Sequence, residues 1–313
     1  MTSTSVPLDA EGLSLRSVSL WHITWRRLFR RRSAIVGMVI LGILSLIALT
    51  AQWIAPYDPY QVLIGVEPVQ RREKPCIHLL GCPKDKPQHI MGIDGNVRDQ
   101  FSRILYGARL SLIIGFATVT FAIVIGTVLG AVAGYFGGWL DNLIMRVMDV
   151  LLAFPALLLA IAIVTVLGPG LINALIAIGI VSIPAYARVV RASVLSVREM
   201  DYVSASRALG GSTFHILFRR ILPNALTPLI VQGTLGIASA ILDAAALSFL
   251  GLGAQPPTPE WGSMLGAERN QIFSAPHLVF FPGLAIMLTV LAFNLLGDGL
   301  RDALDPRLAH VSS

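Results

Sequence analysis

The sequence has little charge. Only 13% of its 313 residues are charged while 55% are hydrophobic, whereas an average soluble domain is about 25% charged. The hydrophobic residues form runs of about 20, the length of helix that crosses a hydrocarbon layer about 30 Å thick. The alternating segments of about ten residues that build transmembrane β-barrels are missing. Because backbone groups in lipid need partners within the segment, the runs predict an all-α, polytopic membrane protein.

Motifs of nucleotide binding and catalysis are also missing. No Gly-x-x-x-x-Gly-Lys-Ser/Thr phosphate loop occurs, so a nucleotide site is expected only on another chain. No nucleophile–base pair or metal cluster indicates an enzyme. The formal charge is +6, but the arginines flank apolar runs, which favours membrane orientation over nucleic-acid binding. The chain is therefore predicted to be non-catalytic, with no cofactor of its own.

Cysteine is scarce, and both cysteines, Cys76 and Cys82, lie in one polar interval. No Cys or His pair at zinc spacing accompanies them, so a four-ligand metal site is not expected. A weaker metal site that uses His78 and His89 is the alternative. If the interval faces an oxidising compartment, the two cysteines are predicted to form a disulfide.

The apolar runs predict six transmembrane helices. They cover residues 33–54, 106–133, 143–167, 171–195, 225–252 and 278–296. An even number of spans places both termini on one side of the membrane, with residues 1–32 and 302–313 as tails. Residues 55–105 form a loop on the opposite side, and residues 106–301 form the core.

Basic residues predict which side is cytoplasmic. Five arginines lie in the collar at residues 26–32, directly before the first span, and six more lie between Arg188 and Arg220. Arg16 and Arg307 add to the same side. The 55–105 loop is also rich in Lys and Arg, which conflicts with the positive-inside rule. Since the first helix usually dominates, the N- and C-termini are predicted to be cytoplasmic.

The interval 198–224 predicts a helix, a turn and a second helix on the cytoplasmic side. Asp201 can cap the first helix, and Gly210 can supply the left-handed residue that ends it. Ser212 can cap the second helix, which is expected to stop before Pro223. A narrow face of small residues on the first helix suits a groove on a partner protein. The alternative is a helix pair that lies on anionic lipid.

Three elements of this interval resemble the EAA loop of the membrane subunits of bacterial ATP-binding-cassette (ABC) importers. They are Ser204-Ala205-Ser206, Gly210 and Ile221-Leu222-Pro223. The sequence departs from the family at Ser204, where a glutamate is frequent. The resemblance implies that the loop is a coupling helix that docks on an ATPase. The coupling residues are then Ser204, Ala205, Ser206, Arg207, Ala208, Leu209 and Gly210.

Further strings resemble the dipeptide/oligopeptide/nickel branch of these importers, as the second of two permeases. They are residues 92–99 and 102–112, Arg146 to Asp149 with Phe154-Pro155, residues 247–253 and residues 255–262. The resemblance implies a type I importer permease fold in the inner membrane. It also implies a homologous permease, two ATPases that bind ATP and Mg, and an extracytoplasmic binding protein as partners. Peptides are the expected substrates, and nickel chelates or sugars are the alternatives.

Charged and proline residues within the spans are candidates for the translocation path. Asp243 is expected to line the path or the subunit interface, or else to be a neutral or locally bonded carboxylate. Arg146 and Asp149 have i, i+3 spacing and are predicted to form a structural ion pair, with a gating role as the alternative. Pro155 and Pro184 are expected to kink their helices. A secondary transporter is the rival function, but the internal repeats typical of that class are not evident.

Overall fold

A computed structural model of the chain describes residues 25–26 and 28–304. The predicted tails lie largely outside this part, including Arg16, Arg27 and Arg307. Within the described residues the structure is helical and contains no β-strand. The all-α prediction is therefore confirmed.

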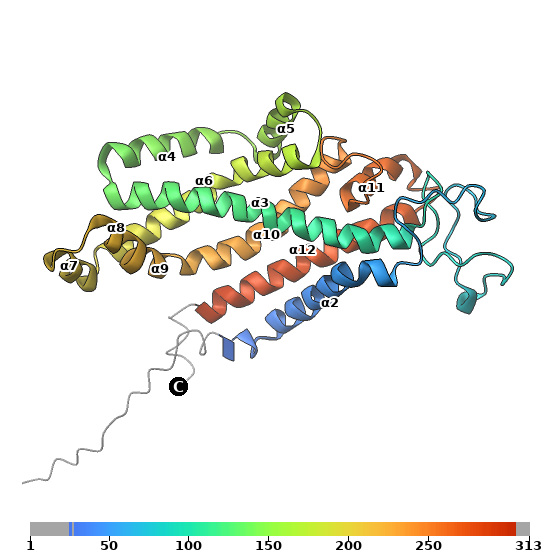
Figure 1. The fold of residues 1–313 in the computed structure, drawn as a ribbon, viewed down its shortest axis with the longest axis horizontal. Helices are drawn as coiled ribbons and strands as arrows, with labels where there is room; N and C mark the ends of the chain where they lie inside the picture. Colours follow the sequence, from blue (N-terminus) through green and yellow to red (C-terminus); the bar gives the residue numbers. More distant parts are fainter. Residues whose placement is uncertain (1–24, 27, 305–313) are drawn as a thin grey trace, which may run out of the picture.

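Five helices are long and apolar enough to cross a membrane. They are α2 (Arg32–Ile54), α3 (Gln100–Phe136), α6 (Leu171–Arg198), α10 (Thr227–Phe249) and α12 (His277–Leu304). Figure 1 shows them running along the long axis of the molecule as one bundle. Helix α3 packs on α6, α10 and α2, and α12 packs on α2 and α10.

The predicted span at residues 143–167 is wrong as a single helix. It consists of α4 (Gly138–Leu152) and α5 (Ala156–Leu167), which meet at an angle of 92°. The bundle has six spans if this pair counts as one. Pro155 adopts an extended conformation before α5 and offers no N–H to continue the helix. The result is a break and not the expected kink, whereas Pro184 lies inside a continuous α6.

Three glycines hold α3 close to α6. Gly126, Gly130 and Gly134 follow one another at intervals of four residues, so they share one face of α3. A side chain at Gly130 would collide with the carbonyl oxygen of Ala187, and one at Gly134 would reach within 2.9 Å of the carbonyl oxygen of Arg191. Only glycine lets the two backbones approach this closely.

The two ends of the bundle carry different structures. The end where α2 begins and α12 finishes also carries α7 (Asp201–Ala208) (Figure 1). It is followed by α8 (Thr213–His215), the π-helix η2 (Ile216–Ile221) and α9 (Leu222–Ala225). The opposite end carries the α2–α3 loop with η1 (His78–Leu80), and α11 (Trp261–Glu268) with η3 (Arg269–Gln271).

Candidate functional site

Helix α7 ends as predicted but begins differently. Met200, not Asp201, is the N-cap residue, and it makes no side-chain cap. Met200 has an extended backbone, so Asp201 becomes the first helical residue, where its carboxylate faces the positive end of the helix dipole. Gly210 has a φ of +79°, and the N–H of Gly211 donates to the carbonyl of Ser206 at 3.0 Å. The predicted left-handed turn at Gly210 is confirmed.

The second helix of this segment begins as predicted but does not stop where expected. The Ser212 hydroxyl accepts a hydrogen bond from the N–H of His215 at 3.4 Å, which confirms the cap. The chain then continues through η2 into α9, and Pro223 lies in the first turn of α9. A first-turn residue needs no N–H donor within the helix, so the proline is tolerated there.

The coupling residues predicted from the family resemblance lie on an open surface. Val203 is the only buried residue of α7, while Ser206 is half-buried and the other coupling residues are exposed. Leu209 is 88% exposed and Phe214 is 71% exposed. The ring of Phe214 lies 4.4 Å from the ring of Phe218 between centroids. The turn therefore presents small and apolar side chains at the surface of this end.

A small set of contacts fastens this segment together. The Tyr202 hydroxyl donates to the carbonyl of Arg220 at 3.3 Å, and the Asn224 amide donates to that carbonyl at 2.8 Å. Arg198, the last residue of α6, donates to the carbonyls of Gly134 and Tyr135 at 3.2 and 2.9 Å. The segment is thus tied to the end of α3 directly before α7 begins.

The predicted ion pair of Arg146 with Asp149 is wrong. The Asp149 carboxylate on α4 accepts from Arg188 on α6 at 2.6 Å. An i, i+3 spacing permits a pair on one helix but does not exclude a partner on a neighbouring helix. A second bridge, in which Arg191 donates to Asp141 at 2.6 Å, also joins α6 to α4. No sequence pattern indicated these long-range pairs.

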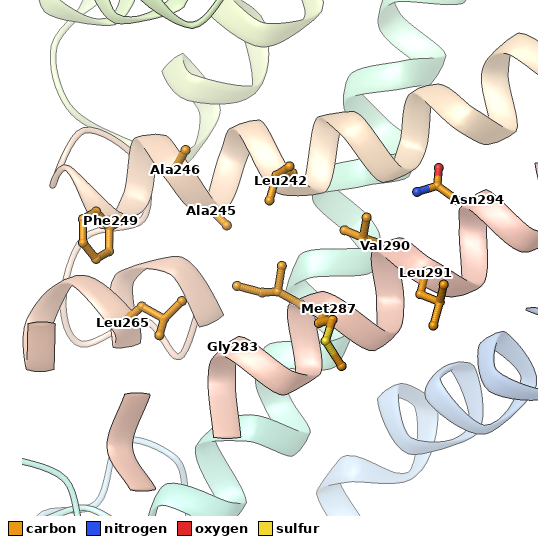
Figure 2. A pocket seen from close by; sticks show the side chains of 11 residues that line it. Leu242, Ala245, Ala246, Phe249, Leu265, Gly283, Met287, Val290, Leu291 and Asn294 are labelled. Atoms are coloured by element: carbon orange, nitrogen blue, oxygen red, sulfur yellow. The ribbon is translucent and has the colours of Figure 1, made fainter. Parts of the chain in front are cut away.

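An apolar groove of about 720 Å³ lies between α10, α11 and α12 (Figure 2). It is lined by Leu242, Ala245, Ala246, Phe249, Leu265, Gly283, Ile286, Met287, Val290, Leu291 and Asn294. Figure 2 shows the Asn294 amide as a polar group among apolar side chains. Asp243 follows Leu242 on α10 and is half-buried, but it is not among the lining residues. Its role in the path stays a prediction.

Cys76 and Cys82 are joined by a disulfide in the structure, with Cα atoms 5.4 Å apart. That separation lies within the range that a disulfide bridges. Whether the bond forms in the cell stays a prediction. His78 lies 2.8 Å from the carbonyl of Lys86. Among the described residues, no group of three or more His, Cys, Asp or Glu side chains could hold a metal ion.

His89 connects the α2–α3 loop to the start of α3. Its Nδ1 lies 2.8 Å from Asp99 Oδ1 and its Nε2 lies 3.1 Å from Glu67 Oε2. Burial alone would lower the pKa of His89, but the hydrogen bonds and charges of Asp99 and Glu67 outweigh it and raise that pKa. Asp99 also accepts from the N–H and the hydroxyl of Ser102, which explains why α3 begins at Gln100, before the apolar run.

Three of the sequence strings that carried the family resemblance meet at this end. Arg98 and Arg103 from the first strings both donate to the carbonyl of Pro257, at 3.4 and 3.1 Å. The Glu260 carboxylate caps α11 by accepting from the N–H of Ser263 at 2.7 Å. Burial raises the pKa of Glu260, although these backbone hydrogen bonds act in the opposite direction. The strings therefore encode one buried junction.

Comparisons with known proteins agree with this architecture. Residues 126–310 match the family described as the binding-protein-dependent transport system inner membrane component. Residues 19–71 match the N-terminal transmembrane domain of oligopeptide transport permease C. The chain is similar in fold to the MetNI methionine ABC transporter in an inward-facing conformation, with a TM-score of 0.53 and 20% identity. That match covers 64% of this chain and 96% of the other.

Several relatives match nearly the full length of the chain. The dipeptide transport system permease protein DppC of Alkalihalophilus pseudofirmus is 50% identical, over 93% of this chain and 91% of the relative. The di/tripeptide permease DppC of Pseudomonas aeruginosa is 48% identical, over 92% of each chain. The glutathione permease GsiD of Pectobacterium atrosepticum is 46% identical, over 92% and 91%. The chain therefore belongs to the family of binding-protein-dependent transport system inner membrane components, as a non-catalytic permease subunit of an ABC importer.

Proposed function

We propose that this permease forms half of an import route for short peptides. The observation that carries the proposal is its identity of 46–50% to permeases named for dipeptides, di- and tripeptides, and glutathione, which is itself a tripeptide. A homologous permease supplies the other half of the route, and a substrate-binding protein delivers the peptide. The chain lies in the inner membrane with cytoplasmic N- and C-termini.

Residues 204–210 are the proposed contact with an ATPase subunit. The exposed small face of α7, ended by the Gly210 turn, supports docking in a groove. Ser204 replaces the glutamate that is frequent in the family, so this contact lacks one carboxylate. Exposed Leu209 and Phe214 give it an apolar character instead. ATP and Mg bind to the two partner ATPases and not to this chain.

The proposed mechanism is alternating access. Closure of the ATPases on ATP displaces the α7–α9 segment, and the Arg198 contacts pass that displacement to the end of α3. The close glycine contacts make α3 and α6 move together. ATP can favour one arrangement of the bundle only because the ATPases bind that arrangement more tightly.

The coupling role is tested by cross-linking from Ala205→Cys in a Cys76→Ser/Cys82→Ser background. Membranes that contain the whole transporter are compared with and without ATP. A cross-link to the ATPase whose yield changes with nucleotide is expected. Gln88→Cys, exposed at the opposite end, is the matched control and should capture no ATPase. Free reaction of Ala205→Cys with bulky cytoplasmic reagents and no captured ATPase would instead support a helix pair lying on lipid.

The substrate class is tested by uptake into vesicles that contain the reconstituted importer. ATP-dependent accumulation of a labelled dipeptide, competed by glutathione and not by a sugar, is expected. Accumulation without ATP would support a secondary transporter. Accumulation of only a nickel chelate or a sugar would overturn the peptide assignment while it leaves the importer class intact.

A further inference from the structure

The α2–α3 loop displays two adjacent leucines. Leu79 is 95% exposed and Leu80 is 81% exposed. Both lie in η1, inside the ring that the Cys76–Cys82 disulfide closes. Within this ring the N–H groups of Leu80 and Cys82 both donate to the carbonyl of Ile77, at 2.9 and 3.3 Å. The ring holds the two leucines outward, since their backbone is bonded into a tight turn.

The base of this ring is anchored in the protein. The N–H of Cys76 donates to the carbonyl of His89 at 2.9 Å. His89 is buried between Asp99 and Glu67, at the start of α3. A tip that is already ordered loses little conformational entropy when it binds. The leucines are therefore displayed on a preorganised support.

Exposed lysines outnumber acidic residues beside the exposed leucines, although Asp85 is also exposed there. Lys74, Lys84 and Lys86 are all exposed near the ring. Lys86 pairs with Glu73 at 3.2 Å, whereas Lys74 and Lys84 form no ion pair among the described residues. Apolar side chains inside a cationic rim complement an apolar recess that is edged by carboxylates.

We propose that residues 74–86, the dileucine tip, dock into such a recess on a soluble protein outside the cell membrane. This inference rests on the proposed function, in which that soluble protein is the substrate-binding protein. Figure 1 shows the loop extending past the ends of α2 and α3, away from the bundle. That placement favours a partner in the aqueous space over the lipid that surrounds the helices.

The test uses the whole importer in nanodiscs, with a purified binding protein defined by its stimulation of peptide-dependent ATP hydrolysis by the unmodified complex. The Leu79→Ser/Leu80→Ser variant should raise the half-maximal binding-protein concentration by roughly tenfold or more, since it removes two exposed leucines that docking would bury. Basal ATP hydrolysis should not change. Ile64→Ser/Val66→Ser, on the same loop and 61% exposed at both positions, is the matched control and should match the unmodified complex.

Further measurements separate the loss of a docking contact from misfolding of the tip and from binding to the membrane. Leu79→Met/Leu80→Met should restore the half-maximal concentration to within about twofold. An intact disulfide, measured by mass in the serine variant, shows that the tip still folds. An unchanged half-maximal concentration in that variant overturns the proposal. So does a shift that occurs only in nanodiscs with anionic lipid, which would assign the leucines to the membrane surface. If the unmodified complex hydrolyses no ATP, the proposed function fails and the docking proposal falls with it.

Discussion

The two ends of the bundle use opposite kinds of structure. Most buried polar and charged side chains of the described chain lie at the end that carries the α2–α3 loop. They are His89, Asp94, Arg98, Asp99, Gln100, Ser102, Arg103, Glu260, Glu268 and His277. The α7–α9 segment at the other end contributes none to that set. It is held by apolar anchors such as Val203 and Ile216 and by a few hydrogen bonds.

This difference indicates what each end can do. Most members of this buried network are paired, although Arg103 Nε and His277 Nε2 have no hydrogen-bond partner among the described residues. Such a network holds one geometry, because each lost partner leaves a charge in a low-dielectric site. An exposed helix pair with few anchors can shift as a body at little cost. The loop end therefore keeps its shape, and the weaker anchoring of the α7 end is consistent with the proposed movement of that end.

Removal of one carboxylate from each end should give the largest contrast. Asp99→Ala should lower the free energy of unfolding by about 2–5 kcal/mol, since it removes one of the two carboxylates that hold the buried His89 and uncaps α3. Asp201→Ala removes an exposed carboxylate that caps nothing and should leave unfolding nearly unchanged. Denaturation of the purified protein in detergent measures both. Equal losses in the two variants would contradict the contrast between the ends.

Replacing both cysteines should loosen only the loop end. On the chain-entropy model, a ring with a sequence separation of six contributes about 2 kcal/mol. Cys76→Ser/Cys82→Ser should therefore speed proteolysis and hydrogen exchange of residues 74–86 and leave α7 unchanged. Reductant should have the same effect on the unmodified protein and none on the variant. If reductant changes neither, the cysteines are not paired in the cell.

A substitution at the turn after α7 should affect only the other end. Gly210→Ala places a side chain at a φ of +79°, which costs about 1–2 kcal/mol locally. Peptide transport should fall more than ATP hydrolysis, and the exchange of the α2–α3 loop should not change. Gly42→Ala on α2, where a side chain meets open space, is the control and should transport normally. A parallel loss in both variants would point to a general defect of folding.

The smallest expected effect is a pH dependence confined to the loop end. The pKa of His89 is raised above its unfolded value of about 6.5. Its stabilisation is therefore complete below that value and is lost as pH rises through the raised pKa. Glu67, Asp99 and Tyr57 face the imidazole, and the pKa of Tyr57 is raised to about 12 by burial and by Glu67. Exchange protection of the loop should fall as pH rises above about 6.5, and His89→Gln should remove this fall.

Local patterns predicted much of this structure. The apolar runs located the membrane helices, and Gly210 and Ser212 located the turn between α7 and α8. The spacing of Gly126, Gly130 and Gly134 is the Gly-xxx-Gly pattern of close helix contacts, and it could have predicted the approach of α3 to α6.

Features set by tertiary contacts could not be predicted in this way. Pro155 indicates an interruption, but the 92° angle depends on how α4 and α5 pack on α6. The partner of Asp149 is 39 residues away in sequence. The junction of Arg98 and Arg103 with Pro257 joins segments more than 150 residues apart. Single-sequence spacing carries no information on such pairs.

Helix α3 connects the two ends of the bundle as one long, continuous helix. It has 37 residues, so it is about 55 Å long. Its first turn is capped by Asp99 in the loop-end network, and Arg198 donates hydrogen bonds to carbonyls in its last turn. A tilt of about 5° about one end displaces the other end of such a rod by about 5 Å. The glycine contacts with α6 stiffen α3 against bending. In the proposed mechanism, this stiffness determines how much of a displacement at one end of α3 reaches the other end.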